Sequence, residues 1–259
     1  MADKTQLTIR IILRSILPLF KTLYNENEGA YKKMLSGVNG TIQFSVKGTD
    51  SSAYLEFKDG KLDVLQGIHP SPGIHFAFKK PEDMVAFFTG GVALPSISGL
   101  WRLRLLMKLA PLFMGLLLLM PNNQPKDPAK RLLKVKLTMY MVTNALSQLN
   151  KGGDEDMMAW TLKQPDRIYQ LSVQPDGPAA YLRVKGGKSK SGHGIYGRKV
   201  PFIHMMFNGL DGAYKVLAES KETVQAMRDS DVKLEGSPEY AGVMGSFMVR
   251  IQNLLMPAK

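Results

Sequence analysis

Three glycines in the second half of the chain, Gly192, Gly194 and Gly197, have the spacing G-x-G-x-x-G. In dinucleotide-binding proteins such glycines lead directly into a helix whose N-terminus holds a pyrophosphate. Here Pro201 and an apolar, strand-like run follow, so we expect a flexible hairpin loop and no nucleotide site. The basic stretch KGGKSKSGHG at 185–194 could grip a phosphate head group, although a solvated loop is the usual outcome for a charge run of this kind.

The four histidines, His69, His75, His193 and His204, are the other candidates for acid–base or metal chemistry. No two of them have the spacing of metal ligands on one helix, and we expect them to be structural. The chain has no Cys, which excludes disulfides, thiolate catalysis and Cys-ligated zinc or iron–sulfur clusters. Walker, H-E-x-x-H and G-x-S-x-G motifs are missing as well. We therefore expect no catalytic residue, no metal and no cofactor.

The composition is that of a globular protein with a basic surface. Hydrophobic residues make up 44% and charged residues 22% of the 259 positions, and the net charge is +12. A positive charge favours anionic partners. The basic residues are spread through both halves without a clustered basic face, so we expect no nucleic acid partner. The 16 methionines suit adaptable apolar pockets or an irregular core.

No segment has the properties of a signal peptide or a membrane-spanning helix. The apolar run in residues 1–20 is interrupted by Arg10 and Arg14, and no small-residue cleavage site follows. Leu109–Met120 is 12 residues long, whereas a bilayer span needs about 20. We expect a cytoplasmic protein with transient membrane contact.

The two halves of the chain repeat each other at an offset of 127 residues. Residues 42–61 contain IQFSV and AYLEFKDGK, and residues 169–188 contain YQLSV and AYLRVKGGK. Pro and Asn in the segment between the halves are typical of a linker. We therefore expect a first domain at 1–121, a linker at 122–130 and a second domain at 131–259.

Both halves predict the same order of elements: a helix, antiparallel strands and two further helices. Ile42, Phe44 and Val46 alternate with polar residues, which predicts a strand with one buried face, and Tyr169, Leu171 and Val173 repeat the pattern. Further strands are expected near 74–78 and 202–206. Helices are expected over 7–24, 81–88 and 100–120, and then over 130–149, 210–219 and 238–255. The fold class is α+β, twice.

This order of elements resembles the sterol carrier protein type-two family of small lipid carriers. The resemblance is closer in the second half, in IYQLSV, AYLRVKGG and LAESKETVQAMRDSDVKLEGSPEYAGVMGSFMVRIQNLL. In the first half, FTGGVALPSISGLWRLRLLMKLAPL is similar, but its closing helix lacks the strand and Ser-Pro entry and is more hydrophobic. The resemblance implies two tandem domains, each a mixed, mostly antiparallel sheet covered by helices around an apolar cavity. It also implies carriage of sterols, fatty acyl chains or other lipids without catalysis.

Apolar side chains on the strands and closing helices are the candidates for cavity lining, with plain core as the alternative. They are Phe76, Phe78, Phe87, Phe88, Trp101, Leu105, Phe113, Met205, Phe207, Tyr214, Leu217, Met244, Phe247, Met248 and Ile251. Basic residues beside the apolar run, Arg102, Arg104 and Lys108, are the candidates for contact with an anionic membrane. Two other functions stay open, an accessory enzyme domain acting on a hydrophobic acyl substrate and a scaffold whose cavities are filled. The sequence does not give the oligomeric state.

Overall fold

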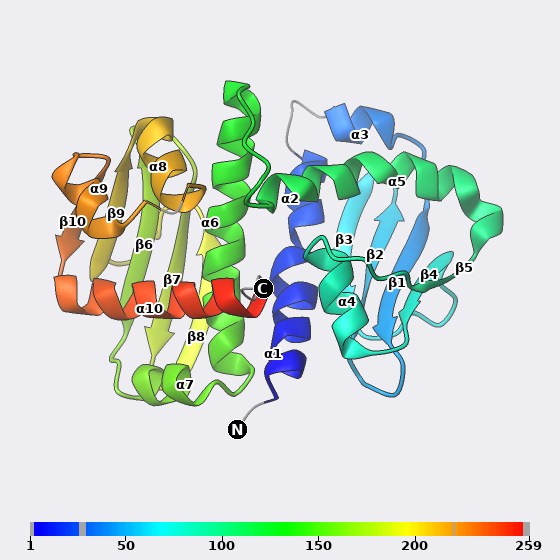
Figure 1. Cartoon of the computed structure of the whole chain (residues 1–259), viewed down its shortest axis with the longest axis horizontal. Coiled ribbons are helices and arrows are strands. Elements are labelled where there is room, and N and C mark those ends of the chain that lie inside the picture. Colours follow the sequence, from blue (N-terminus) through cyan, green and yellow to red (C-terminus); the bar gives the residue numbers. More distant parts are fainter. Residues whose placement is uncertain (1–2, 26–29, 220, 256–259) are drawn as a thin grey trace. The chain divides into compact units, whose positions relative to one another are not determined.

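The computed structural model describes residues 3–25, 30–219 and 221–255, without the side chains of Ala30, Leu103, Arg104 and Lys108. The chain divides into two compact units, one from Asp3 to Met120 and one from Pro121 onwards (Figure 1). Each unit has one mixed sheet and its own helices, which confirms the α+β class.

The first unit contains five strands in the order β3-β2-β1-β4-β5. Its elements are α1 (Lys4–Ile11), the π-helix η1 (Ile12–Ile16), α2 (Leu19–Asn25), α3 (Ala30–Met34), β1 (Gly40–Val46), β2 (Ser52–Lys58), β3 (Lys61–Gln66), β4 (Ile74–Phe78), α4 (Pro81–Phe88), β5 (Ser96–Ser98), the 3-10 helix η3 (Leu100–Arg102), α5 (Leu103–Leu116) and the 3-10 helix η4 (Leu117–Leu119). β1 and β4 are parallel, and the other neighbouring strands are antiparallel.

The second unit also contains five strands, and their order is β8-β7-β6-β9-β10. Its elements are α6 (Pro128–Lys151), α7 (Glu155–Leu162), β6 (Arg167–Gln174), β7 (Ala179–Lys185), β8 (Lys188–His193), β9 (Ile203–Asn208), α8 (Gly209–Leu217), α9 (Thr223–Arg228), β10 (Val232–Gly236) and α10 (Pro238–Leu255). β6 and β9 are the parallel pair. The two sheets therefore have the same topology.

The pairing of β1 with β2 and of β6 with β7 follows the 127-residue offset of the sequence, while the parallel partners β4 and β9 are offset by 129 residues. Ile42 of β1 faces Leu55 of β2, and Tyr169 of β6 faces Leu182 of β7. The parallel partner of Ile42 is Ile74, and that of Tyr169 is Ile203. The corresponding strands thus pair in the same register within each unit.

Local signals set the ends of the helices in the second unit. Asp127 caps α6 by accepting a hydrogen bond from the amide of Ala129, and Pro128 stands at the first helical position. α6 therefore starts inside the segment predicted as a linker. Asp154 caps α7 in the same way, with the amide of Met157 as the donor. α10 begins at Pro238, where the sequence predicted it.

The central strands are buried on both faces, although the sequence predicted one buried face. Gln43 is 0% and Gln170 is 1% exposed. The Gln43 amide donates to the carbonyls of Phe44, Ala53 and Gly67 and accepts from the amide of His69. Gln170 makes the same four bonds with Leu171, Ala180, Gly194 and Tyr196. The segment after the third strand of each sheet is thus held against its outer face, and the amide satisfies buried backbone groups.

Two further expectations need correction. The first unit does have a short strand, β5, before its closing helix, and β5 pairs with β4. The segment that follows Gly192 is not a hairpin, because β8 lies at an edge of the sheet and the next strand, β9, pairs with β6. As predicted, a strand and not a helix is the next element after these glycines.

Within the described residues, no helix combines the length and the apolar character that crossing a bilayer requires.

Candidate ligand-binding surfaces

Most of the predicted lining residues of the first unit form one aromatic cluster on its sheet. The ring of Phe113, from α5, lies 4.9 Å from Phe20 of α2, 6.2 Å from Phe76 of β4 and 6.3 Å from Phe87 of α4. Phe44 of β1 stacks on Phe76 at 5.2 Å. Ring centroids 4.5–7 Å apart are in direct packing contact. The rings therefore fill the space between the strands, α4 and α5.

Burial separates the members of this predicted set. Phe76, Phe78, Phe88 and Leu105 are buried, and Phe87 and Phe113 are half-buried. Trp101 on η3 is 83% exposed, so the structure does not bring it to the cluster. η3 immediately precedes α5, and it presents Trp101 to solvent although the sequence placed this residue on a buried stripe.

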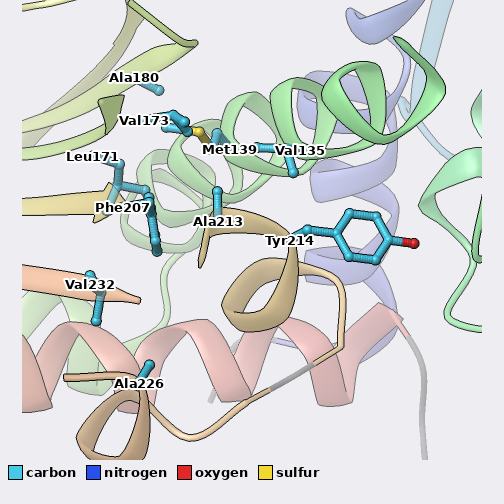
Figure 2. Close-up of a cluster of buried hydrophobic side chains, with 10 residues drawn as sticks. All are labelled: Val135, Met139, Leu171, Val173, Ala180, Phe207, Ala213, Tyr214, Ala226 and Val232. Carbon is cyan, nitrogen blue, oxygen red and sulfur yellow. The ribbon is translucent and has the colours of Figure 1, made fainter. Parts of the chain in front are cut away.

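The predicted residues of the second unit are also packed side chains. Phe207 belongs to a buried cluster with Leu171, Val173 and Met139, and Met205, Leu217 and Met248 pack against it (Figure 2). The buried residues of α10 are Met244, Phe247, Ile251 and Leu255. Tyr214 points away from Phe207 in Figure 2, and its ring lies under the guanidinium of Arg131 at 4.3 Å.

An apolar groove that the sequence did not predict lies elsewhere in the second unit. Its volume is about 740 Å³. It is lined by Asn150, Lys151, Met158, Ala159, Leu162, Gly186, Gly187, Lys188 and Ser189. None of the predicted lining residues contributes. The sequence signal for this groove was the spacing of Met158 and Leu162, which are four residues apart and so share one face of α7. Their side chains are 48% and 70% exposed on that face.

Hydrogen bonds fix the wall of this groove. The side chain of Asn150, near the end of α6, donates to the carbonyl of Gly187 and to Ser189 Oγ, and it accepts from Thr161 of α7. Gly186 and Gly187 have φ values of 48° and 81°, which the two-residue turn between β7 and β8 requires. The amide of Gly187 also donates to the carbonyl of Thr161. The groove is thus a preformed feature of α6, α7 and the turn.

A second apolar surface lies on α5 of the first unit. The helix buries Leu105, Leu109, Leu112 and Leu116, yet Met107 and Met114 on its other face are 60% and 66% exposed. Leu117, Trp101 and Leu94 are exposed nearby in sequence, at 48%, 83% and 92%. Arg102 is exposed; the side chains of Arg104 and Lys108 lie outside the described part of the chain. An exposed apolar helix face of this kind is typical of a surface that meets another apolar phase.

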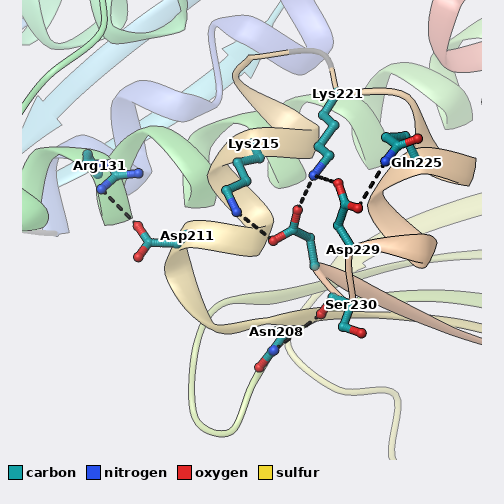
Figure 3. A network of polar contacts seen from close by, with 9 residues as sticks. Arg131, Asn208, Asp211, Lys215, Lys221, Gln225, Asp229 and Ser230 are labelled. Carbon is teal, nitrogen blue, oxygen red and sulfur yellow. Dashed lines mark hydrogen bonds and ion pairs between the residues drawn. The ribbon is translucent and has the colours of Figure 1, made fainter.

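The acidic groups that gather in the second unit are ion-paired. Lys215 and Lys221 both contact Asp231, and Lys221 also contacts Asp229 (Figure 3). Hydrogen bonds from these lysines hold the pKa values of Asp231 and Asp229 below their usual range. Such carboxylates stay ionised at neutral pH and tie α8 and α9 to the start of β10. No group of three or more His, Asp or Glu in the described residues could hold a metal ion.

Two histidines occupy equivalent places in the two sheets. His75 Nε2 lies 2.7 Å from Ser45 Oγ, and His204 Nε2 lies 2.8 Å from Ser172 Oγ. Burial lowers the pKa of both histidines, and the charge of Glu235 partly opposes this for His204. Both imidazoles are therefore neutral at pH 7, in keeping with a structural role.

Comparison with known proteins gives one matching family and several distantly similar structures, two of which are described below. Residues 20–94 match the SCP-2 sterol transfer family. This segment lies in the first unit, whereas the sequence suggested a closer resemblance in the second half. No curated protein matches the chain.

The two structures are less similar. Sterol carrier protein 2 from Yarrowia lipolytica in its apo form has 16% identity and a TM-score of 0.31, covering 40% of this chain and 92% of that one. A double mutant of the sec-alkyl sulfatase PisA1 has 14% identity and a TM-score of 0.27, covering 63% of this chain and 31% of the sulfatase. Likenesses this distant support no conclusion about this chain.

Proposed function

We propose that the chain binds a sterol, fatty acyl chain or other lipid and transfers it between membranes without a chemical step. The observation that carries this proposal is the match of residues 20–94 to the SCP-2 sterol transfer family. The matched segment runs from α2 to the loop after α4 and so includes four of the five strands of the first sheet. We also propose that the second unit is a tandem copy of the first, on the basis of the shared strand order and register.

The apolar groove of the second unit is the place where the geometry best suits such a ligand. Its volume of about 740 Å³ falls within the range of roughly 300–1,000 Å³ that is usual for ligand sites. Met158, Ala159 and Leu162 offer an apolar wall, where each buried methylene of the ligand contributes roughly 0.8 kcal/mol. Lys188 at the groove supplies a positive charge for an acidic head group.

The predicted aromatic residues of the first unit stay part of the proposal as a second location. Phe113 packs against Phe20, Phe76 and Phe87, so a ligand reaches this cluster only if α5 moves away from the sheet. Because α5 is apolar on both faces, an apolar ligand or a bilayer replaces its contacts at low cost.

Native mass spectrometry of the full chain tests the function. The purified protein is incubated with phosphatidylcholine vesicles that contain a sterol and a fatty acid, separated from them, and then extracted with organic solvent. We expect an adduct whose extracted component has the mass of one added lipid, unchanged. A chain that takes up neither lipid contradicts the proposed function.

A pair of variants tests the groove. Ala159→Trp places a large ring at the exposed groove wall, and we expect about tenfold weaker lipid binding, because lost burial of a few methylenes amounts to that factor. Val224→Trp is the matched control, since Val224 is a 54% exposed helix residue that does not line the groove. If Ala159→Trp binds lipid like the control, the ligand lies elsewhere, and the aromatic cluster becomes the site to test.

We further propose that the exposed face of α5 makes transient contact with anionic membranes. Arg102 lies at the start of this apolar surface, and the sequence places Arg104 and Lys108 beside it. A basic residue near an anionic surface contributes about 1 kcal/mol, which salt screens.

Flotation with vesicles tests this contact. We expect the triple variant Arg102→Glu, Arg104→Glu, Lys108→Glu to float less than wild type on vesicles that contain phosphatidylserine, and we expect salt to weaken wild-type binding. The control Lys47→Glu, Lys58→Glu, Lys61→Glu changes the net charge equally at exposed positions of the same unit. Equal flotation of the triple variant and wild type would rule out this surface.

A further inference from the structure

A polar pocket of the second unit lies on the outer face of its sheet. Its volume is about 250 Å³. It is lined by Tyr181 and Arg183 of β7, Lys190 and His193 of β8, and Ile195, Tyr196, Gly197 and Arg198 of the following segment. Three of these side chains are cationic, and the two tyrosines carry a phenolic hydroxyl. Neither the apolar ligand nor the membrane contact of α5 uses them.

The frame of the pocket is rigid. Gln170 holds the segment after β8 through the carbonyl of Gly194, at 3.2 Å, and the amide of Tyr196, at 3.0 Å. The ring of Tyr196 then packs edge-on against Tyr181, with centroids 4.9 Å apart. Gly192 faces Tyr181 on the neighbouring strand, and a Cβ at Gly192 would overlap the Tyr181 ring. The two hydrogen bonds of Gln170 and the ring packing of Tyr181 therefore position the segment that carries Tyr196, while Lys190 and Arg198 are exposed.

The cations of the pocket exceed its acidic groups. Arg183 donates to both carboxylate oxygens of Asp166, at 2.8 and 2.6 Å, through Nε and one terminal nitrogen. Its second terminal nitrogen is left for another acceptor. Lys190, directly opposite Arg183 on β8, and Arg198 form no ion pair with any residue of the described ranges. Like charges that face each other on neighbouring strands destabilise a sheet.

The first sheet shows that the fold does not require these charges. The cross-strand pair Arg183–Lys190 corresponds to Glu56–Asp63 in the first sheet, where both residues are acidic. Asp63 is neutralised there by Lys21 at 2.7 Å. An aromatic pair is present in both sheets, since Tyr54 packs against His69 at 5.1 Å. The same frame thus carries a surplus of positive charge in one unit only.

We propose that this pocket binds a phosphomonoester group. A dianionic phosphate has enough acceptor oxygens for the free Arg183 nitrogen, Lys190, Arg198 and the two tyrosine hydroxyls, and it relieves the repulsion between Arg183 and Lys190. A carboxylate offers fewer acceptors and half the charge. The phosphomonoester belongs either to a lipid head group or to a small soluble molecule, and these two sources share the same chemistry. The proposal does not rest on the apolar ligand.

Titration with phenyl phosphate tests the pocket with a soluble probe. We expect binding by calorimetry, and about a hundredfold weaker binding in the double variant Lys190→Ala, Arg198→Ala, because each of the two lost charge-assisted hydrogen bonds contributes about a factor of ten. Both side chains are exposed and form no ion pair within the described residues, so the variant keeps its fold. Lys58→Ala, Lys61→Ala is the control, since it removes two exposed lysines from the turn between β2 and β3 of the first sheet.

Vesicles distinguish the lipid source from the soluble one. Phosphatidylcholine vesicles containing phosphatidic acid are compared with vesicles containing phosphatidylglycerol at equal surface charge. A preference for phosphatidic acid that Lys190→Ala, Arg198→Ala removes assigns the pocket to a lipid head group. Binding of phenyl phosphate without such a preference assigns it to a soluble phosphomonoester. The proposal is overturned if neither probe binds, or if the variant binds both as wild type does.

Discussion

The outer faces of the two sheets carry opposite charges at equivalent positions of the same topology. Both sheets have the same strand order, and both use a buried glutamine, Gln43 or Gln170, to hold the segment after the third strand. On that frame the first sheet presents Glu56 and Asp63, and the second presents Arg183 and Lys190. Positions that satisfy the backbone are therefore shared, while positions that meet solvent have diverged in charge.

The helical sides of the units differ in a comparable way. The first unit has seven phenylalanines linked by ring contacts and an apolar face on α5 that stays exposed. The second unit has smaller side chains in its cluster, including Ala180 and Ala213, and an open apolar groove beside α7. One topology therefore supports two distinct surfaces, and we have proposed membrane contact for the first and ligand binding for the second.

The largest expected effect tests the shared interior. Phe78 and Phe207 occupy equivalent places on β4 and β9, opposite Val46 and Val173, and both are 0% exposed. Phe78→Ala and Phe207→Ala should each cost about 3–5 kcal/mol of unfolding free energy, because each leaves a cavity in a packed core. Hydrogen exchange of β1 and β6 measures the loss in each unit. A cost below 1 kcal/mol in one unit alone would break the equivalence of the interiors.

A smaller effect tests the shared glutamine. Gln43→Ala and Gln170→Ala leave buried backbone groups without partners, so each should lower the unfolding free energy by about 2–3 kcal/mol. Gln252→Ala, at an exposed position of α10, is the control and should change little. Gln170→Ala should also weaken phenyl phosphate binding, since Gln170 positions Tyr196. Unchanged exchange rates in the segments around 67–69 and 194–196 would contradict this role.

The smallest expected effect is the pH dependence of stability that His75 and His204 cause. Burial places the folded-state pKa values of His75 and His204 below the unfolded value of 6.5. The unfolded chain therefore binds protons first, so stability is fully present above pH 6.5 and falls as the pH drops towards the folded pKa. His75→Gln and His204→Gln should therefore each remove part of this pH dependence. Urea unfolding between pH 7 and pH 5 measures it, and a variant that keeps the full pH dependence of wild type would contradict the assigned cause.

The strands were predictable from the sequence because alternation and the 127-residue repeat are local signals. β1, β2, β6 and β7 lie where the apolar alternation placed them. Pro81 and Pro238 correctly predicted where α4 and α10 begin. Most predicted lining residues are indeed buried or half-buried, because the same periodicity marks any side chain that faces the sheet.

The surfaces were not predictable, because they depend on contacts between distant segments. No residue near Gln170 in the sequence indicates that the segment around Tyr196 packs over it. A polar residue on a strand is therefore predicted to be exposed. The groove forms where Asn150, Thr161 and Gly187 meet from three elements. Trp101 looked like part of an apolar stripe, yet η3 presents it to solvent. Periodicity predicts which face of an element is apolar but not which neighbour covers it.

Lipid transfer between vesicles tests the central claim most directly. Donor phosphatidylcholine vesicles carry a fluorescent sterol or a fluorescent fatty acid, and acceptor vesicles contain phosphatidylserine. The account predicts that the initial transfer rate of at least one lipid rises in proportion to protein concentration, that Ala159→Trp slows it while Val224→Trp does not, and that the lipid is recovered chemically unchanged. A rate no higher than that without protein, or a lipid recovered as a reaction product, would contradict the account.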